Sequence, residues 1–418
     1  MKKESIIVLL LASINFTHIL DFMIMMPLGN YLMPYFQISP KQFSFLVAAY
    51  TFSAAASGFA AAFFVDRYDR KKVLLFGYVG FLVGTYACGF APTYQLLLAA
   101  RTLAGIFGGL IAAQVLSIIS DLFGYERRGA AMGAVMSSFA IASTIGVPLA
   151  LYLANIFSWH APFIFVGLLG TAIVFLVIRL IPSSTSHITQ AKENSHRLQA
   201  LIDVLRNRVQ LWTLVFSCLV MMGHFLIIPF INPFLEFNRG FSRSLTPIIY
   251  LVGGIASFIS ALLLGKFSDK VGKLKVFSWS VLFSFLMVWI ITNMPVIPFL
   301  IVLMLFAIWF SVATGRAVTA QAMISNVAEA EQRGSFMSFN SSVQQLGTAL
   351  ASVIAGFVVI KDSAGKLEHY NWVGYISIMV LLSGLLLARY LFKSMDKRVA
   401  VELESRGHQS DLAIKTTD

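Results

Sequence analysis

The sequence has little charge and almost no cysteine. Only 12% of its 418 residues are charged and 58% are hydrophobic, whereas an average soluble domain carries about 25% charged residues. A soluble protein of this length needs a larger polar surface, so the composition excludes the soluble classes. Two cysteines exclude a disulfide scaffold and a cysteine-rich metal site. We therefore expect a polytopic membrane protein with no metal and no cofactor.

The sequence contains long apolar runs. A bilayer core of about 30 Å requires roughly 20 apolar residues per helix, and the chain contains twelve such runs in two sets of six. We therefore predict an all-α membrane protein. Its spans are expected near residues 5–27, 41–65, 73–91, 94–119, 130–156, 161–182, 209–235, 245–267, 276–293, 296–323, 336–360 and 373–393.

The spans divide the chain into two halves. We predict an N-terminal six-helix bundle over residues 1–182, a linker over 183–208, a C-terminal six-helix bundle over 209–393 and a tail over 394–418. The side with both termini and the linker has 24 lysines and arginines, and the opposite side has five. Because cytoplasmic loops carry the excess of positive charge, we expect the termini, linker and tail in the cytoplasm. The net charge of +12 then requires no nucleic-acid partner.

Two loop patterns recur in the two halves. Asp66-Arg67-Tyr68-Asp69-Arg70-Lys71-Lys72 follows the second span and Asp269-Lys270-Val271-Gly272-Lys273 the eighth, at an offset of 203. Glu126-Arg127-Arg128-Gly129 follows the fourth span and Glu331-Gln332-Arg333-Gly334 the tenth, at an offset of 205. Two matches at nearly one offset indicate a duplication. Since each repeat contains an even number of helices, both copies have the same orientation.

These patterns resemble those of the major facilitator superfamily, most closely the bacterial twelve-helix drug:proton antiporter and metabolite-efflux branch. The resemblance covers essentially residues 5–393. The second-half loop fully matches the family pattern G-x-x-x-D-[RK]-x-G-[RK]-x-[RK], whereas the first-half loop has Ala62 and Asp69 where the family has glycine. Further similar stretches are Asp21–Pro27, Arg101–Gly105, Gly146–Pro148 and Trp159–Phe163.

The resemblance implies a secondary active transporter that works by alternating access, as a monomer in the bacterial inner membrane. Its partners would be the lipid bilayer, protons and a small organic substrate, with the proton gradient as energy source. Proton-coupled export of a drug or metabolite is the expected direction. Import of an anionic metabolite or siderophore, and a transporter-like membrane sensor, remain alternatives. The chain has no H-E-x-x-H and no P-loop, so we do not expect an enzyme.

The repeated loops are candidates for a conformational latch, in which a carboxylate caps a neighbouring helix or pairs with arginine. Plain membrane topology is the alternative. Asp69 is expected to weaken a tight turn that glycine would allow. Gly146 and Pro148, in the fifth span, predict a bending or sealing element, or ordinary packing of small residues. The predicted latch residues are Asp66, Arg67, Arg70, Lys72, Glu126, Arg128, Gly265, Asp269, Lys270 and Gly272.

Asp21, Arg101 and Arg316 are the strongly charged residues well inside spans. Such groups cost at least about 2.5 kcal/mol on insertion scales, so each is a functional-site hypothesis. A rise of 1.5 Å per residue places Asp21 and Arg101 roughly 24 and 20 Å from the cytoplasmic face, which allows them to pair. We predict that Asp21 exchanges the coupling proton beside Arg101, with a purely structural ion pair as the alternative. His18, one turn before Asp21, and His224 are further candidates.

Arg316 bears on the substrate. With Arg101 it makes two cations against one carboxylate, which favours an anionic or zwitterionic substrate. Snorkelling towards the cytoplasm is the alternative. Aromatic side chains on the first and seventh spans suit a soft binding pocket, or packing alone. The substrate-binding candidates are Arg316, Asn15, Phe22, Gln114, Phe225, Asn232, Asn340 and Gln344.

Overall fold

The computed structural model describes residues 3–64, 68–123, 125–182, 204, 206–328 and 333–415. Within them it has 12 helices long and apolar enough to cross a membrane, which confirms the predicted all-α class. The span boundaries agree with the predicted ones to within a few residues in most cases. The spans are Glu4–Met25, Pro40–Ala61, Arg70–Gly89, Tyr94–Ile119, Ala131–Ile156, Ala161–Leu180, Arg208–Asn238, Arg243–Val271, Lys273–Thr292, Phe299–Ser325, Phe336–Val358 and Tyr370–Lys393.

The elements of each half follow one another in chain order. The first half consists of α1 (Lys3–Met25), α2 (Gly29–Phe36), α3 (Pro40–Phe64), α4 (Arg70–Gly89), α5 (Tyr94–Leu122), α6 (Tyr125–Ile141), η2 (Ala142–Gly146), α7 (Val147–Ile156) and α8 (Ala161–Leu180). The second consists of α11 (Arg208–Phe225), α12 (Ile228–Pro233), η3 (Phe234–Asn238), η4 (Arg243–Leu245), α13 (Thr246–Val271), α14 (Lys273–Thr292), α15 (Phe299–Ser325), α16 (Arg333–Val358), β1 (Ile360–Lys361), β2 (Leu367–Glu368) and α17 (Tyr370–Lys415).

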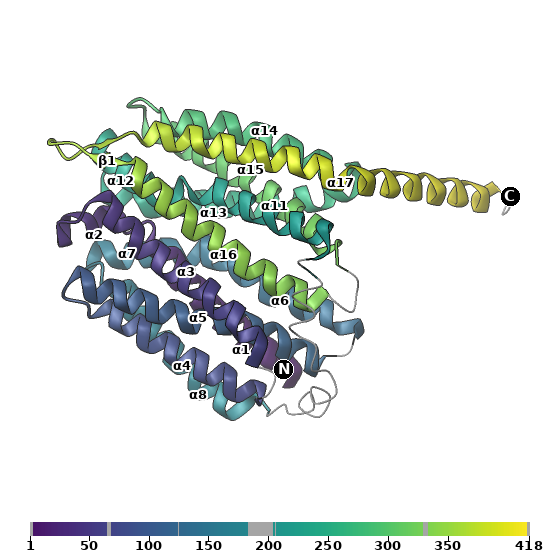
Figure 1. Cartoon of the computed structure of the whole chain (residues 1–418), viewed down its shortest axis with the longest axis horizontal. Helices are drawn as coiled ribbons and strands as arrows, with labels where there is room; N and C mark the ends of the chain where they lie inside the picture. Colours follow the sequence, from purple (N-terminus) through teal and green to yellow (C-terminus); the bar gives the residue numbers. More distant parts are fainter. Residues whose placement is uncertain are drawn as a thin grey trace.

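The two ends of the bundle differ. The start of α1 and the long extension of α17 lie at one end, which we call the terminus side (Figure 1). Helix α2 and the β1–β2 hairpin lie at the other end, which we call the hairpin side. The hairpin is antiparallel, with Ile360 opposite Glu368. Helix α17 continues without a break to Lys415, through most of the predicted tail. Most of the predicted linker, residues 183–203 and 205, lies outside the described residues.

Prolines interrupt two spans that the apolar pattern predicts as continuous. In the fifth span, the π-helical turn η2 joins α6 to α7, and Pro148 stands in the first turn of α7. In the seventh, α11 ends at Phe225, and Pro229 and Pro233 stand in α12 before the π-helical turn η3. Proline has no N–H to donate to the preceding turn. The regular α-helical ladder therefore breaks at these positions.

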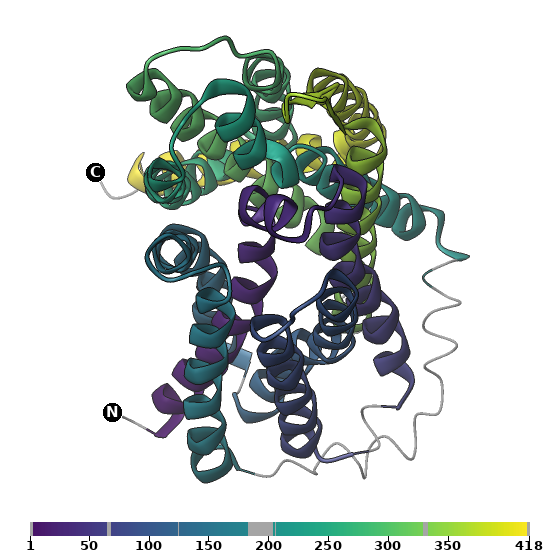
Figure 2. The same ribbon diagram turned by 90° about the vertical axis from the view of Figure 1, so that its left-hand side faces the viewer.

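The hydrophobic core is shared on one side and divided on the other. On the hairpin side one cluster of buried residues includes both Leu20 of the first half and Phe230 of the second. On the terminus side each half has a cluster of its own, around Ile111 and around Phe277. Figure 2, which looks from the hairpin side, shows the two bundles with α2 between them. The shared core therefore lies on the hairpin side, whereas towards the terminus side the halves meet where α3 packs against α16, with Phe59 stacked on Phe339.

Candidate functional site

A buried ion pair lies inside the first half. Arg101 on α5 and Asp21 on α1 are both fully buried, and Nη1 of the arginine lies 2.7 Å from Oδ2 of the aspartate. Thr85 on α4 donates to the other carboxylate oxygen at 3.1 Å. The guanidinium also lies over the ring of Tyr50 on α3, 4.4 Å from its centroid. Four helices thus meet at one neutralised charge pair, and the predicted pairing of Asp21 with Arg101 is present.

Close packing of α5 against α3 brings Tyr50 to this position. A Cβ on Gly105 would lie 2.3 Å from the carbonyl oxygen of Tyr50, and one on Gly109 would lie 2.3 Å from that of Ala54. Any side chain at these two glycines would separate the helices. Gly105 belongs to the Arg101–Gly105 stretch that carries the family resemblance, so the same short motif supplies the charge and the space beside it.

His18 lies next to this pair with free polar atoms. Neither of its ring nitrogens has a hydrogen-bond partner among the described residues, and the same holds for the Tyr50 hydroxyl. The two ring centroids are 6.2 Å apart. Gly108 faces both, since a Cβ there would lie 2.7 Å from the Tyr50 hydroxyl and 3.1 Å from Nε2 of His18. Buried polar atoms usually find a partner, so these groups are available to water, a proton or a substrate.

A second buried cation lies inside the other half. Arg316 on α15 is 2% exposed. Its Nη1 donates to the Ser284 hydroxyl on α14 at 2.8 Å, and its Nη2 lies 3.2 Å from Nδ1 of His224 on α11. Arginine has no acceptor, so Nδ1 accepts and the imidazole carries its proton on Nε2. No carboxylate of the described residues pairs with Arg316, unlike Arg101.

Aromatic rings connect the two polar clusters across the halves. Phe22 of α1 lies 5.8 Å from Phe225 of α11 and stacks on Tyr50 at 5.8 Å. In the second half, the ring of His224 lies 5.2 Å from that of Phe225 and 5.5 Å from that of Trp309, measured between ring centroids. The predicted aromatic candidates Phe22 and Phe225 therefore lie where α1 and α11 meet, between the two arginines.

The other substrate-binding candidates are dispersed. The side-chain amide of Asn15 donates to the Val135 carbonyl at 3.2 Å and fastens α1 to α6. Asn232 donates across the halves to the Pro27 carbonyl at 3.0 Å. Gln344 contacts Gln321 at 3.4 Å in an exposed position. Gln114 and Asn340 are buried, and their amide oxygens have no hydrogen-bond partner in the described part of the chain. Their roles in binding stay predictions.

The two copies of the repeated loop turn in different ways. In the second half, Gly272 has φ +107°, a conformation that favours glycine, between α13 and α14. Its counterpart Asp69 has φ −55° and caps α4 by accepting from the Lys71 N–H at 2.8 Å. The expectation that Asp69 weakens the turn is therefore wrong, because an N-cap position suits aspartate.

Some of the predicted latch residues lie within the described part of the chain. Asp269 lies 3.7 Å from Lys273, in a partly exposed pair. Lys270 is in the last turn of α13, and a Cβ on Gly265 would have no atom within 4 Å. Arg70 and Lys72 are in the first turn of α4. Asp66 and Arg67 lie outside the described residues, as do the side chains of Glu126 and Arg128 on α6.

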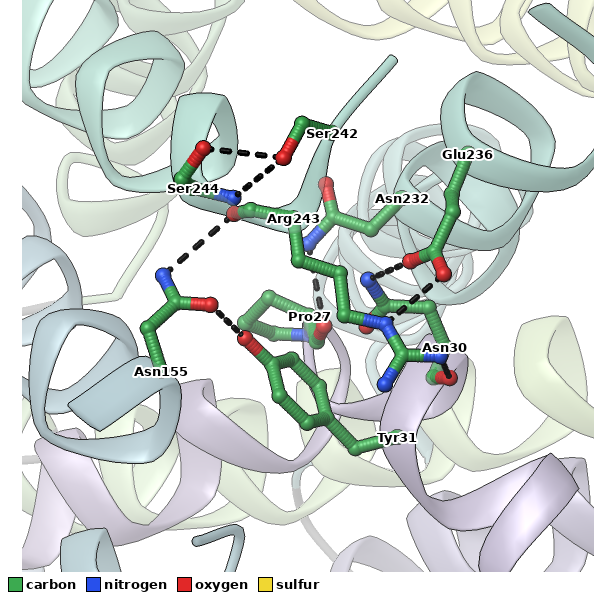
Figure 3. A network of polar contacts seen from close by, with 9 residues as sticks. All are labelled: Pro27, Asn30, Tyr31, Asn155, Asn232, Glu236, Ser242, Arg243 and Ser244. Atoms are coloured by element: carbon green, nitrogen blue, oxygen red, sulfur yellow. Dashed lines mark hydrogen bonds and ion pairs between the residues drawn. The ribbon is translucent and has the colours of Figure 1, made fainter. Parts of the chain in front are cut away.

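A polar network that the sequence does not predict joins the halves on the hairpin side (Figure 3). We call it the hairpin-side network. Glu236 accepts from Arg243 Nε at 2.7 Å and from the Asn30 amide at 2.6 Å. Arg243 also donates to the Asn30 carbonyl at 3.0 Å. Tyr31 donates to Asn155, whose amide donates to the Arg243 carbonyl at 3.3 Å. Burial raises the pKa of Tyr31 to about 12, so its hydroxyl stays protonated.

The only signal for this network in the sequence is Glu236, an acid at the end of an apolar run and seven residues before Arg243. A second contact between the halves lies deeper. Gly254 of α13 faces η2, where a Cβ would lie 2.5 Å from the Cα of Thr144. The π-helical turn before Pro148 is thus in backbone contact with the other half.

The fold and these contacts define a helical membrane protein of duplicated architecture, with a buried charge in each half. The chain belongs to the Major Facilitator Superfamily, whose family model matches residues 11–315 and 218–415. It is therefore a multi-pass membrane protein of a transporter family.

Individual relatives are distant. "Uncharacterized MFS-type transporter YceJ" of Bacillus subtilis (strain 168) is 24% identical over 367 residues, which is 87% of this chain and 90% of the relative. "Multidrug resistance protein 2" of the same organism is 23% identical, with 85% and 89% covered. Among solved structures, a D-xylose-proton symporter has a TM-score of 0.71 at 14% identity, with 91% and 96% covered. A bacterial homologue of the human lysosomal transporter Spinster has a TM-score of 0.70 at 16% identity, with 94% and 98% covered.

Proposed function

We propose that this protein is a proton-coupled secondary transporter of a small organic anion. The observation that carries the proposal is Arg316, which is buried and hydrogen-bonded to the neutral partners Ser284 and His224. A buried cation without a counter-charge costs several kcal/mol. A carboxylate or phosphate on the substrate would offset this cost and accept the remaining N–H groups.

Asp21 is the proposed proton site. It is the one fully buried carboxylate among the described residues. Its charge neutralises Arg101, and Thr85 supports the second oxygen. When Asp21 takes up a proton, Arg101 loses its counter-charge. Protonation of this one side chain therefore changes the charge of the first half, which a coupled transporter requires.

Two directions of coupling follow from different observations. Export by proton antiport is implied by the Gly146–Pro148 stretch, which places a π-helical turn against α13 of the other half. The multidrug-resistance name of one relative supports it. Import by proton cotransport is the second candidate, and the charge balance favours it. An anion binds more strongly when Asp21 is neutral and, by reciprocity, promotes protonation of Asp21, so proton and anion move together.

Transport in proteoliposomes with an imposed pH gradient and a luminal pH dye tests the proposal. Organic anions, sugars and lipophilic cations are added in turn. We expect organic anions alone to change proton flux, and Asp21→Asn to abolish the change. Normal proton-driven transport by Asp21→Asn would rule out Asp21 as the proton site. A response to cations alone would contradict an anionic substrate.

Equilibrium binding of the active anion separates the two arginines and the two directions. We expect Arg316→Gln to weaken binding roughly 10- to 100-fold, the value of a charged hydrogen bond, and Arg316→Lys to weaken it less. Unchanged affinity in Arg316→Gln would overturn the substrate assignment. In the wild type, affinity that rises at low pH indicates cotransport, and affinity that falls indicates antiport.

A further inference from the structure

The membrane-facing surface of the second half carries an apolar groove. It has a volume of about 340 Å³ and lies among α13, α14 and α15. Leu263 and Phe283, two of its lining residues, are 63% and 61% exposed. In a membrane-spanning protein, apolar side chains that are this exposed within the spans face lipid. The groove therefore opens to the bilayer.

The first half shows what fills the corresponding place there. Ala61, Val73 and Leu110 form a small buried cluster, with Phe107 packed against it. The Phe107 ring also fills the space beside Gly80, where a Cβ would lie 2.4 Å from it. The site between α3, α4 and α5 is thus closed by the chain's own side chains.

The repeat relation explains why the second half is open. At the offset of 205, Phe107 corresponds to Val312 and Leu110 to Gly315. An aromatic ring returns at Phe283, which corresponds to Gly80 at the offset of 203, but most of this side chain is exposed. The space beside Gly315 is filled by Leu264 and Ser280, since a Cβ there would lie 2.6 Å and 2.9 Å from them. Val312 in place of the large Phe107 ring therefore accounts for the groove.

Lysines lie at the terminus-side end of the groove. Lys270 comes three residues after the lining residue Phe267 on α13, and Lys273 comes three residues before the lining residue Val276 on α14. Residues three apart share a helix face, so both lysines continue the walls of the groove. Asp269 lies 3.7 Å from Lys273 and is the single acid of this stretch. The flanking lysines are Lys266 and Lys275.

We propose that the groove binds one acyl chain of an anionic phospholipid from the leaflet on the terminus side, with the phosphate at Lys270 and Lys273. The apolar lining suits a hydrocarbon chain, which gains packing contacts in a groove of this kind. The excess of lysine over acid selects a negatively charged head group, since each basic residue near the membrane surface strengthens anionic-lipid binding. The first half, closed by Phe107, is expected not to hold such a lipid.

Lipid retention tests the proposal. The full-length protein is incorporated in nanodiscs of equal parts phosphatidylglycerol and phosphatidylcholine, and bound lipid is counted by native mass spectrometry after mild extraction. We expect the wild type to retain one phosphatidylglycerol. Val312→Phe copies the first-half residue into the groove and is expected to lose it. Equal retention of the two lipids by the wild type, or no retention, would overturn the proposal.

The lysines provide a second variant that leaves the interior untouched. Lys270→Gln with Lys273→Gln is expected to keep a bound lipid but to lower the preference for phosphatidylglycerol about thirtyfold, the effect of two surface lysines. Lys361→Gln with Lys366→Gln removes two lysines on the hairpin side and should change nothing. If Val312→Phe lowers transport but retains phosphatidylglycerol as the wild type does, the groove serves an apolar substrate and the lipid proposal is wrong.

Discussion

The Asp21–Arg101 pair has a stability role that can be separated from any role in transport. Removing one partner of a buried pair leaves an uncompensated charge and costs about 3–5 kcal/mol, whereas removing both is far less damaging. We expect Asp21→Asn to lower the unfolding temperature strongly, because Arg101 then stays buried without its partner. Asp21→Asn combined with Arg101→Met should recover most of the loss.

Thermal unfolding in detergent micelles measures both variants. Ser13→Ala, which removes an exposed hydroxyl on the same helix that contacts only the backbone of its own turn, is the control and should unfold like the wild type. A double variant that is less stable than either single variant would show that the pair does not stabilise the fold in this way.

Single residues differ in how far the sequence reveals them. Depth makes a pairing of Asp21 with Arg101 possible, because the rise of a helix is fixed, and the family resemblance brings their two spans to one cavity. Thr85 and Tyr50 could not be found in this way, since neutral hydroxyl residues are common in spans and carry no signal of their own. His224 and Arg316 are both candidates from the sequence, but their contact depends on how α11 and α15 rotate about their axes.

At the scale of elements, apolar runs predict where the spans lie but not where they break. The fifth and seventh spans contain proline, and the structure replaces part of each with a π-helical turn. The sequence offers Pro148 and Pro233 as positions where a bond is lost. The sequence does not show which carbonyl the next free N–H will bind instead. That choice depends on the helix packed against the break, which is α13 in the case of η2.

The backbone contact between α13 and η2 predicts the effect of a bulky side chain. Gly254→Val places branched carbons where the Thr144 backbone now lies. Overpacking of this kind costs about 1–3 kcal/mol. It destabilises the conformation in which α13 of one half contacts η2 of the other. We expect slower transport with normal expression. Gly133→Val, in the same span as η2 but with no atom within 4 Å, is the matched control, and equal loss in both variants would refute the explanation.

The hairpin-side network predicts a shift in how the halves are held together. Arg243→Met removes the bonds to Glu236 and Asn30, and we expect the hairpin side to open about tenfold more often, as for the loss of a charged hydrogen bond. Arg239→Met is the control, because Arg239 contacts Asn238 and Phe234 of its own half. Spin labels on cysteines at Tyr35 and Val296, 55% and 73% exposed, report the separation. Unchanged distances in Arg243→Met would contradict the prediction.

At the scale of the whole molecule, the duplicated fold carries two unlike halves. Both contain a buried arginine, but among the described residues only the first half supplies a carboxylate for it. Both contain the same three-helix site on the membrane face, but only the first closes it. The sequence repeat predicts the shared architecture from loop motifs alone. The groove differs through a substitution at an equivalent position, Val312 for Phe107. The two arginines do not occupy equivalent positions, because Arg316 comes 215 residues after Arg101 and the loop motifs recur at offsets of 203 and 205. The consequences of both differences depend on packing that the repeat does not encode.

The distribution of lysine and arginine predicts which way the molecule faces. The sequence assigns 24 of these residues to the side of the two termini and five to the hairpin side, so we expect the terminus side to be cytoplasmic. Cysteines at Val296 on the hairpin side and Lys275 on the terminus side can be labelled in a background without Cys88 and Cys218. A membrane-impermeant maleimide should label the first in intact bacterial cells and the second only after permeabilisation. The reverse order would invert the topology, and the anionic lipid proposed at Lys270 would then belong to the outer leaflet.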